Sequence, residues 1–218
     1  MTSKQEDLSL KMAERRKFIV FEGIDGCGKG TQFKLFHNFL WDLSKFNHIV
    51  ATREPYKSKE IREIMAEDKD AYSRPEECAG LFIKDRFMHA EEVIQPALEK
   101  GLVVLSDRYK YSTIAYQSTQ GMPIKWLIHH HKGLPVPDLV YLIDVPVEVA
   151  AERMKAQKDG REKKFESNLD FSGKVRKNYL SFPALFPEED IRVIDGVKPI
   201  EEVHQEIANI FQKKFSTA

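Results

Sequence analysis

The chain has 218 residues, of which 42% are hydrophobic and 31% are charged, a balance typical of a globular protein with a buried core. Lys plus Arg and Asp plus Glu each number 34, so the formal net charge is zero, which argues against a broad electrostatic surface for nucleic acid or anionic membrane. The two cysteines, Cys27 and Cys78, suit a reducing compartment and give no metal-ligand spacing.

Residues 1–16 are expected to form an extension outside the folded domain. They lack the apolar core of a secretory signal, and Glu6, Asp7 and Glu14 argue against a transit peptide. No apolar run approaches the roughly 20 residues that a membrane span needs. We therefore expect a cytoplasmic protein with one domain over residues 17–215.

Five segments are predicted as strands, because they are rich in Val, Ile and Leu and do not alternate with polar residues. These segments are 17–23, 48–54, 101–108, 137–145 and, more weakly, 191–196. Helices are predicted between and after them, at 29–44, 58–67, 75–100, 110–118, 146–157, 165–182 and 198–215. This alternation predicts an α/β fold, with a mostly parallel sheet covered by helices on both faces.

The first strand leads into a glycine-rich turn, residues 23–29, that fits the G-x-x-x-x-G-K phosphate-binding pattern between a strand and a helix. Its glycines let backbone N–H groups converge on phosphate oxygens, and the helix N-terminus adds partial positive charge. Lys29 is expected to neutralise the transferring end of the nucleotide. The predicted ATP-binding residues are Gly23, Gly26, Cys27, Gly28, Lys29, Gly30 and Thr31.

The pattern departs from its usual form at Gly30, where a Ser or Thr normally follows the lysine. The hydroxyl moves one place on, to Thr31, in an order familiar from adenylate and uridylate kinases. Thr31 is therefore a candidate for Mg²⁺ ligation. The alternative is that it contacts only a phosphate while water completes the metal shell.

Charged residues stand at the ends of two predicted strands, where α/β sheets place ligand groups. Asp107 is expected to hold Mg²⁺, directly or through water, and Arg108 to hold the phosphate of an acceptor. Arg53 is expected to be a second clamp on that phosphate. For these residues the competing interpretation is an ordinary ion pair, for Arg53 with Glu54 or a neighbouring carboxylate.

The long helix predicted at 75–100 carries Phe82 and Arg86 four residues apart, on one face. This spacing lets the ring stack on a pyrimidine while the guanidinium donates to a base carbonyl. The competing interpretations are core packing for Phe82 and a surface ion pair with Asp85 or Glu91 for Arg86.

Together these segments resemble the thymidylate kinase (dTMP kinase) family of P-loop nucleoside-monophosphate kinases, over roughly residues 17–212. The resemblance is carried by FEGIDGCGKGTQ (21–32), TREP (52–55), LFIKDRFMHAEEVIQPALEKG (81–101), VLSDRYKYSTIAYQ (104–117) and PDLVYLIDVPVEVAAER (137–153). It implies a three-layer P-loop fold with a five-stranded parallel sheet, a short mobile lid at about 153–166 and a homodimer. It also implies transfer of the γ-phosphate of MgATP to dTMP, in dTTP biosynthesis, with thymine O4 as the carbonyl that Arg86 reads.

The resemblance implies further contacts with the acceptor. Asp25 matches a carboxylate that accepts from the sugar 3′-OH, and Tyr116 matches a ring that packs under the sugar and disfavours a 2′-OH. Thr113 and Gln117 match positions near the base, and Ser112 is expected as an additional substrate contact. A local turn bond remains open for Asp25, and an exposed helix surface remains open for Thr113 and Gln117.

The lid is expected to supply a catalytic arginine, because Gly26 and Cys27 stand where one subgroup of the family has a basic loop residue. Six cations occur within twelve residues and could clamp ATP phosphates when the lid closes: Arg153, Lys155, Lys158, Arg161, Lys163 and Lys164. The last two replace the Asp-Arg of the family's common D-R-x-E ending, and lysine is the poorer bidentate phosphate ligand. Arg161 is therefore the first candidate and Arg153 the second, against the alternative of a solvated helix face.

Two other functions share some of these sequence features. Another nucleoside-monophosphate kinase, for dUMP, UMP or several deoxynucleotides, is favoured by the GKGT order but not by Phe82, Arg86 and Tyr116. A nucleotide switch or silent binding protein is disfavoured, because no N-K-x-D segment occurs and the expected catalytic residues are present. The run HHHKG (129–133) is not predicted to bind metal, since adjacent histidines on a regular element cannot all face one ion.

Overall fold

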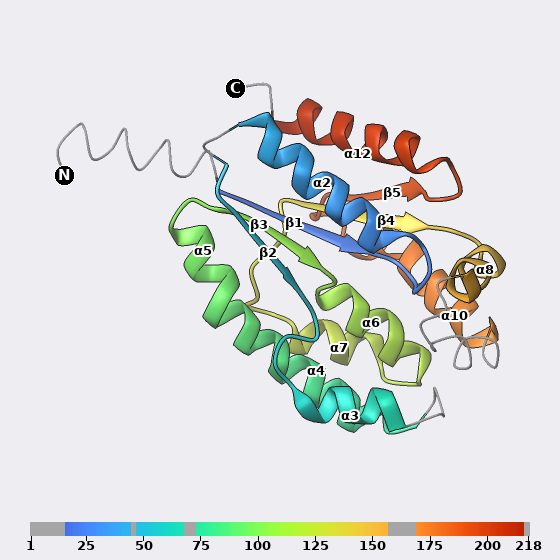
Figure 1. The fold of residues 1–218 in the computed structure, drawn as a ribbon. Coiled ribbons are helices and arrows are strands. Elements are labelled where there is room, and N and C mark those ends of the chain that lie inside the picture. The colour runs from blue at the N-terminus through green and yellow to red at the C-terminus, as the bar shows by residue number, and fades with distance from the viewer. Residues whose placement is uncertain (1–15, 45–46, 68–72, 157–168, 216–218) are drawn as a thin grey trace, which may run out of the picture.

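A computed structural model describes residues 16–44, 47–67, 73–156 and 169–215. Five parallel strands form one sheet in the order β2-β3-β1-β4-β5, with β1 at its centre (Figure 1). The strands are β1 (Lys17–Glu22), β2 (Ile49–Arg53), β3 (Val103–Asp107), β4 (Leu139–Asp144) and β5 (Ile191–Asp195). The predicted parallel α/β sheet is confirmed, and each strand end lies within two residues of its expected position.

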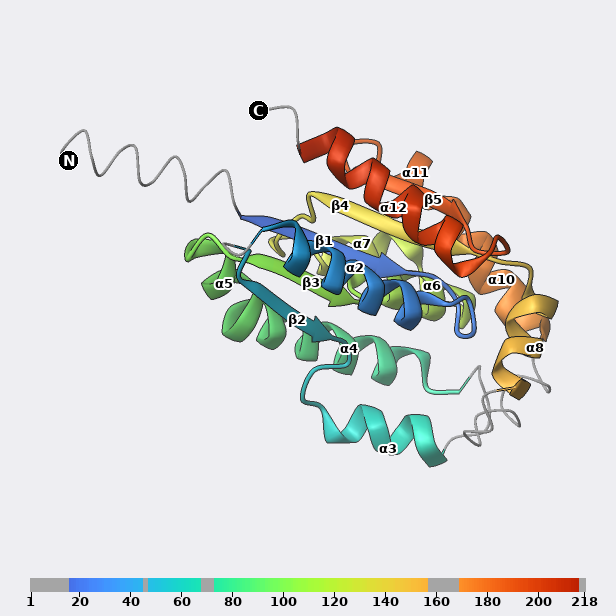
Figure 2. The same cartoon turned by 45° about the horizontal axis from the view of Figure 1, so that its top comes forward.

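Helices cover both faces of the sheet (Figure 2). One face carries α2 (Lys29–Leu43) and α12 (Ile200–Phe215), and the other carries α4 (Pro75–His89), α5 (Gln95–Glu99), α6 (Lys110–Thr119) and α7 (Ile124–His130). The remaining helices are α3 (Lys59–Glu67), α8 (Val147–Ala156), α10 (Leu169–Leu180) and α11 (Phe182–Leu185). None of the helices in the described ranges has both the length and the apolar character that crossing a membrane requires.

The helix predicted at 75–100 is interrupted by a π-helical turn, η1 (Ala90–Ile94), between α4 and α5. At this turn the N–H of Gln95 donates to the carbonyl of Ala90, five residues back. Pro96 follows and has no N–H to continue the regular ladder. Sequence periodicity predicted one helix here because a π turn changes the pattern by a single residue. The short helices α7 and α11 were not predicted.

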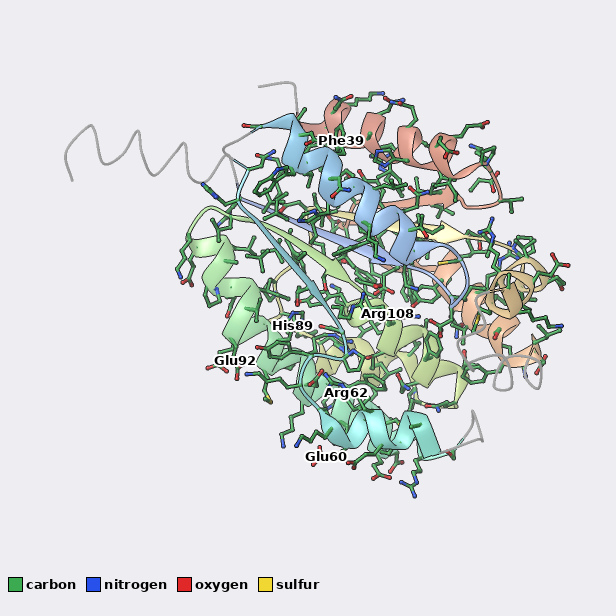
Figure 3. All side chains as sticks on the ribbon, in the orientation of Figure 1. Phe39, Glu60, Arg62, His89, Glu92 and Arg108 are labelled. Atoms are coloured by element: carbon green, nitrogen blue, oxygen red, sulfur yellow. The ribbon has the colours of Figure 1, made fainter. Side chains whose placement is uncertain are left out.

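The core lies on both sides of β1, whose residues 18–22 are buried. On one side the ring of Phe21 lies 5.6 Å from that of Phe36 and 5.2 Å from that of Tyr141, between centroids. Phe39, labelled on α2 in Figure 3, continues this packing to α12 through Phe211, at 6.1 Å. These contacts hold α2 against the sheet, in line with the loop that precedes the helix.

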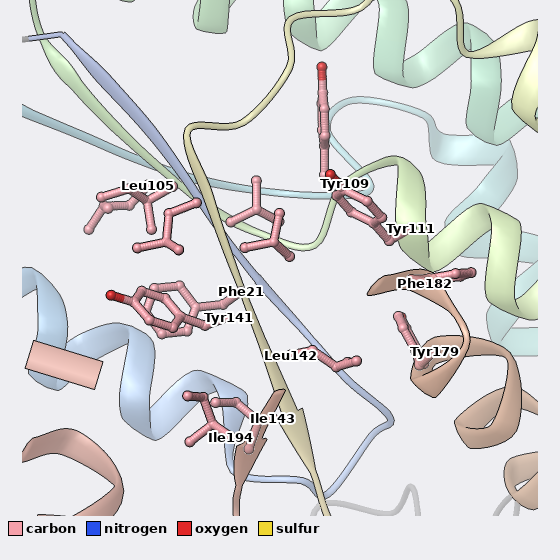
Figure 4. Packing of buried hydrophobic residues seen from close by; sticks show 14 of the residues in the cluster. Phe21, Leu105, Tyr109, Tyr111, Tyr141, Leu142, Ile143, Tyr179, Phe182 and Ile194 are labelled. Carbon is pink, nitrogen blue, oxygen red and sulfur yellow. The ribbon is translucent and has the colours of Figure 1, made fainter. Parts of the chain in front are cut away.

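A second aromatic group lies beyond the other face of the sheet (Figure 4). Tyr179 and Phe182 are 5.5 Å apart between ring centroids, and Phe182 packs against Tyr111 at 6.0 Å. Burying aromatic rings of this size stabilises the fold by about 2–3 kcal/mol each. This group joins α10 and α11 to the first turn of α6, beside the carboxyl end of β3.

Candidate active site

The loop between β1 and α2 has the backbone that a phosphate-binding turn needs. Gly23 and Gly26 have φ angles of 140° and 80°. A Cβ at Gly23 would lie 2.4 Å from the carbonyl oxygen of Ile143, and one at Gly26 would lie 2.4 Å from that of Ala150. Both positions therefore require glycine, because neighbouring backbone lies where a side chain would begin.

Gly30 differs from the other loop glycines. It lies in the first turn of α2, has no positive φ, and has nothing within 4 Å of a Cβ built there. The backbone therefore does not require glycine at the position where the common pattern has Ser or Thr. The helix ladder is formed across this point, because the N–H of Gln32 donates to the carbonyl of Gly28, four residues back, at 3.1 Å.

Arg153, the second candidate for the catalytic arginine, lies against the loop. Its guanidinium donates from Nη1 to the carbonyl of Cys27 at 3.2 Å and from Nη2 to the carbonyl of Gly196 at 2.9 Å. It therefore ties α8 to the phosphate loop and to the turn after β5. Arg161 lies outside the described residues, as do Lys158, Lys163 and Lys164.

Asp107 ends β3 and has one carboxylate oxygen suited to a cation. Its Oδ1 is enclosed and has no hydrogen-bond partner in the described part of the chain, while Oδ2 lies 3.8 Å from Nη2 of Arg53. Among the residues that the structure describes, no three His, Cys, Asp or Glu side chains gather as a complete metal site. Mg²⁺ is commonly held by one or two carboxylates, water and substrate phosphates, so Asp107 fits this ion. Thr31 is exposed in the first turn of α2.

Arg108 lies just beyond β3 (Figure 3) and contacts several of the residues that were predicted to bind the phosphate-accepting substrate. Its Nη2 donates to Oδ1 of Asp25 at 2.5 Å, and its Nη1 donates to Oγ of Ser112 at 2.8 Å. The hydroxyl of Tyr116 lies 3.4 Å from the other oxygen of Asp25. Burial acts to lower the pKa of Arg108, but the carboxylate of Asp25 and other neighbouring acidic groups raise it well above its ordinary value.

Glu22 was not predicted as a site residue, yet it accepts hydrogen bonds from residues around this cluster. Its buried carboxylate accepts from the backbone N–H of Tyr109 at 2.7 Å, from Oγ of Ser112 at 2.7 Å and from the hydroxyl of Tyr179 at 2.9 Å. Burial raises the pKa of Glu22, an effect partly offset by the charge of Arg108 and by these hydrogen bonds. The signal in the sequence is an acidic residue at the end of an apolar strand, directly before the glycine loop.

Arg86 is enclosed between α4, α6 and α7, and only 1% of the residue is exposed. Its Nε donates to Oε2 of Glu54 at 2.7 Å, and its Nη1 donates to Oγ1 of Thr113 at 2.8 Å and to Nε2 of His131 at 2.7 Å. The alternative of a surface pair with Asp85 or Glu91 is therefore wrong. One turn earlier on α4, Phe82 is half-buried.

Gln117 and Arg53 differ sharply in their exposure to solvent. Gln117 is buried on α6, four residues after Thr113, and its Oε1 has no partner in the described ranges. Arg53 is 73% exposed at the end of β2. It borders an open hollow of about 570 Å³ that is also lined by Glu54, Pro55, Tyr56, Arg62 and Ala66.

The comparison with known families agrees with this geometry. The sequence model described as thymidylate kinase matches residues 21–207. The chain belongs to the thymidylate kinase family. This confirms the resemblance stated from the sequence motifs and the P-loop kinase fold that they implied.

Relatives in the thymidylate kinase family match over most of their length. The chain is 40% identical over 202 residues to a probable thymidylate kinase of Pyrococcus horikoshii, covering 88% of this chain and 94% of the relative. It is 37% identical over 205 residues to one of Thermococcus kodakarensis, covering 89% and 97%. It is 37% identical over 201 residues to the thymidylate kinase of Fervidobacterium nodosum, covering 89% and 98%.

Within this thymidylate kinase family member, the predicted site residues form two connected groups. The first contains the glycine loop with Lys29 and the pair of Arg108 and Asp25. The second lies where α4 and α6 face each other, with Arg86 and Thr113. The structure adds three residues that were not predicted from the sequence. Glu54 and His131 contact Arg86 in the second group, and Glu22 contacts Ser112 beside the first.

Proposed function

We propose that the chain is a thymidylate kinase that transfers the γ-phosphate of MgATP to dTMP, giving dTDP and ADP in the formation of dTTP. We further propose one catalytic domain over residues 17–215, acting in the cytoplasm. The observation that supports this most strongly is the cluster that Arg108 and Tyr116 form with Asp25 of the glycine loop. Membership in the thymidylate kinase family supports the choice of acceptor.

Each residue has a role that follows from its chemistry. The loop N–H groups and Lys29 hold the phosphates of ATP, while Arg108 and Arg53 hold the phosphate of dTMP. Asp25 accepts from the sugar 3′-OH, and Tyr116 packs under the sugar. Phosphoryl transfer needs alignment and charge stabilisation rather than a covalent intermediate, so these positioning groups account for most of the catalysis.

Base recognition is assigned to the second group. Phe82 stacks on the pyrimidine, Arg86 donates to a base carbonyl, and Thr113 and Gln117 lie near the base. Oε1 of Gln117 has no partner among the described residues, which supports a polar contact there, because a buried amide oxygen without a donor is costly. Ser112 acts through its hydrogen bond with Arg108.

Mg²⁺ would be held by Asp107, with Thr31 as a second oxygen ligand or a phosphate contact. The ion supplies neutralisation of charge on the terminal phosphates of ATP. The support within the chain is the enclosed Oδ1 of Asp107, which has no hydrogen-bond partner in the described ranges.

The catalytic arginine is proposed to be Arg161, in a lid at about 153–166, with Arg153 as the second candidate. Arg153 already donates to two backbone carbonyls, which suits a residue that shapes the loop. Replacing each by alanine separates the two: loss at Arg161 lowers kcat, whereas loss at Arg153 raises the KM for ATP. A kcat loss confined to Arg153→Ala would reverse the assignment.

We also propose a homodimer, which the family resemblance implies. The apolar stripe of the long helix divides in the structure: Ala90, Ile94 and Ala97 lie in the core, whereas Phe87 is 39% exposed. Sedimentation of the wild type and of Phe87→Asp tests this, and a wild-type monomer would contradict it.

The proposed reaction is tested by coupled ADP release with MgATP and a panel of dTMP, dUMP, UMP, dCMP, AMP and GMP. Turnover strongest with dTMP, weaker with dUMP and absent in Lys29→Ala supports the proposal. Turnover mainly with UMP or dUMP supports the alternative of another pyrimidine monophosphate kinase. Absence of turnover with every acceptor would favour a nucleotide-binding protein.

A further inference from the structure

Three histidines stand side by side at the end of α7, but only one faces the interior. His129 and His130 are exposed, and the ring of His130 stacks on Trp126 with centroids 3.8 Å apart. His131 is 5% exposed and faces Arg86. Two of the three histidines therefore lie at the surface, and only His131 is placed to act on the interior of the protein.

The hydrogen bonds of His131 fix its tautomer. Its Nδ1 lies 2.6 Å from the carbonyl oxygen of Leu127, and a carbonyl can only accept, so Nδ1 carries the proton. Its Nε2 therefore presents a lone pair to Nη1 of Arg86 at 2.7 Å. Burial and the charge of Arg86 lower the pKa of His131 to about 3, so the ring is neutral at neutral pH.

The same contacts nearly exhaust the donors of Arg86. A guanidinium has five N–H groups. Nε and one N–H of Nη2 face Oε2 of Glu54, at 2.7 and 2.5 Å, and the two N–H groups of Nη1 go to Thr113 and His131. Within the described part of the chain, this leaves one N–H, on Nη2, for a further acceptor.

We propose that His131 is a positioning residue for base recognition, which fixes the plane of the Arg86 guanidinium so that a single Nη2–H serves the acceptor base. This inference rests on the proposed function, in which Arg86 donates to a base carbonyl. An N–H held in one direction can donate to a carbonyl oxygen of the base. It finds no acceptor when an amino group takes the place of that carbonyl, and a polar site rejects the wrong base in this way. Without the acceptor on His131, Nη1 keeps only Thr113 of these two partners, and the plane of the guanidinium is held less firmly.

The test uses acceptors that differ at the 4-position of the pyrimidine, a carbonyl in dTMP and an amino group in dCMP. In His131→Leu we expect kcat/KM for dTMP to fall about tenfold and the dTMP-to-dCMP ratio of kcat/KM to fall by a similar factor. The KM for ATP should stay within about threefold of wild type. His131→Gln keeps an acceptor oxygen and should restore most of the ratio.

His129→Leu is the matched control, because it changes an exposed neighbour in the same run, and it should leave the ratio unchanged. His131→Met, with similar bulk and only a weak acceptor, takes the place of His131→Leu if that variant melts below the assay temperature. An unchanged ratio in either variant overturns the positioning role while the wild type remains an active dTMP kinase. A wild type without dTMP turnover overturns the proposed function itself, and this inference with it.

Discussion

The guanidinium of Arg108 lies 2.5 Å from the carboxylate of Asp25, and this pair joins the end of β3 to the phosphate-binding loop. Arg108 also donates to Ser112, so its fork is held on two sides. Its backbone is held too, with a φ of 75° and its N–H donating to the carbonyl of Phe21 at 2.9 Å. A group held this firmly is suited to receive a phosphate in one orientation.

Replacing Arg108 by lysine should show that geometry matters here beyond charge. Arg108→Lys keeps the positive charge but loses the planar fork that engages Asp25 and Ser112 together. We expect kcat/KM for dTMP to fall about 100-fold, with the KM for ATP changed by less than about threefold. Steady-state kinetics with each substrate varied in turn will measure both values. Arg192→Lys, an exposed arginine on β5, is the control, and an equal loss in that variant would contradict the prediction.

The sheet and the loop could be predicted from the sequence because their signals are local. Apolar runs mark buried strands, and the glycines and Lys29 lie within seven residues of sequence. The surroundings of Arg86 could not be predicted, because its partners Glu54, Thr113 and His131 lie 32, 27 and 45 residues away along the chain. Helical spacing placed Arg86 on a face of α4, but only the packing of α6 and α7 decides what that face meets.

A side chain added at Gly26 should damage the protein, whereas one added at Gly30 should be tolerated. Gly26→Ala puts a Cβ 2.4 Å from the carbonyl of Ala150 at a φ of 80°, so we expect a loss of about 2–3 kcal/mol in the free energy of unfolding and loss of ATP binding. Gly30→Ser meets open space in α2 and should change stability by less than about 1 kcal/mol while keeping activity. Urea denaturation and ATP titration distinguish them. Inactivation by Gly30→Ser would show that the glycine itself is required there.

Asp85 should be the residue that holds the loop after β2 in place. Its buried carboxylate accepts the backbone N–H groups of Tyr56 at 2.5 Å, Lys57 at 2.8 Å and Ser58 at 2.7 Å. Asp85→Ala leaves three donors without this partner, so we expect a loss of about 2–4 kcal/mol in the free energy of unfolding and a higher KM for dTMP. Asp85→Asn keeps one carbonyl oxygen and should lose less.

The control for Asp85 is Glu92→Gln, which alters an exposed contact of the same loop with Lys57. Figure 3 labels Glu92 and His89 on the side of the long helix that faces this loop. Stability of Glu92→Gln should stay close to wild type, because exposed ion pairs contribute little. Equal losses in the Glu92 and Asp85 variants would mean that the loop is not anchored at Asp85.

The low pKa of His131 should make the protein sensitive to acid. In the unfolded chain histidine titrates near pH 6.5, whereas burial and Arg86 lower the pKa of His131 to about 3 in the fold. Between these values the unfolded state binds more protons, so the free energy of unfolding decreases as the pH falls, by up to about 1.4 kcal/mol per pH unit. His131→Gln removes this contribution.

Urea denaturation at pH 7, 5.5 and 4 should therefore show a steeper loss of stability in the wild type than in His131→Gln, with a difference of about 3 kcal/mol accumulated at pH 4. The raised pKa of Glu22 works in the opposite direction, since its burial costs stability as the pH rises above about 4.5. That contribution is present in both proteins and cancels in the comparison. His129→Gln, at the exposed neighbour, should follow the wild-type curve. Parallel curves for the wild type and His131→Gln would mean that His131 accepts a proton in the folded state as easily as in the unfolded chain, against the geometry of its bond from Arg86.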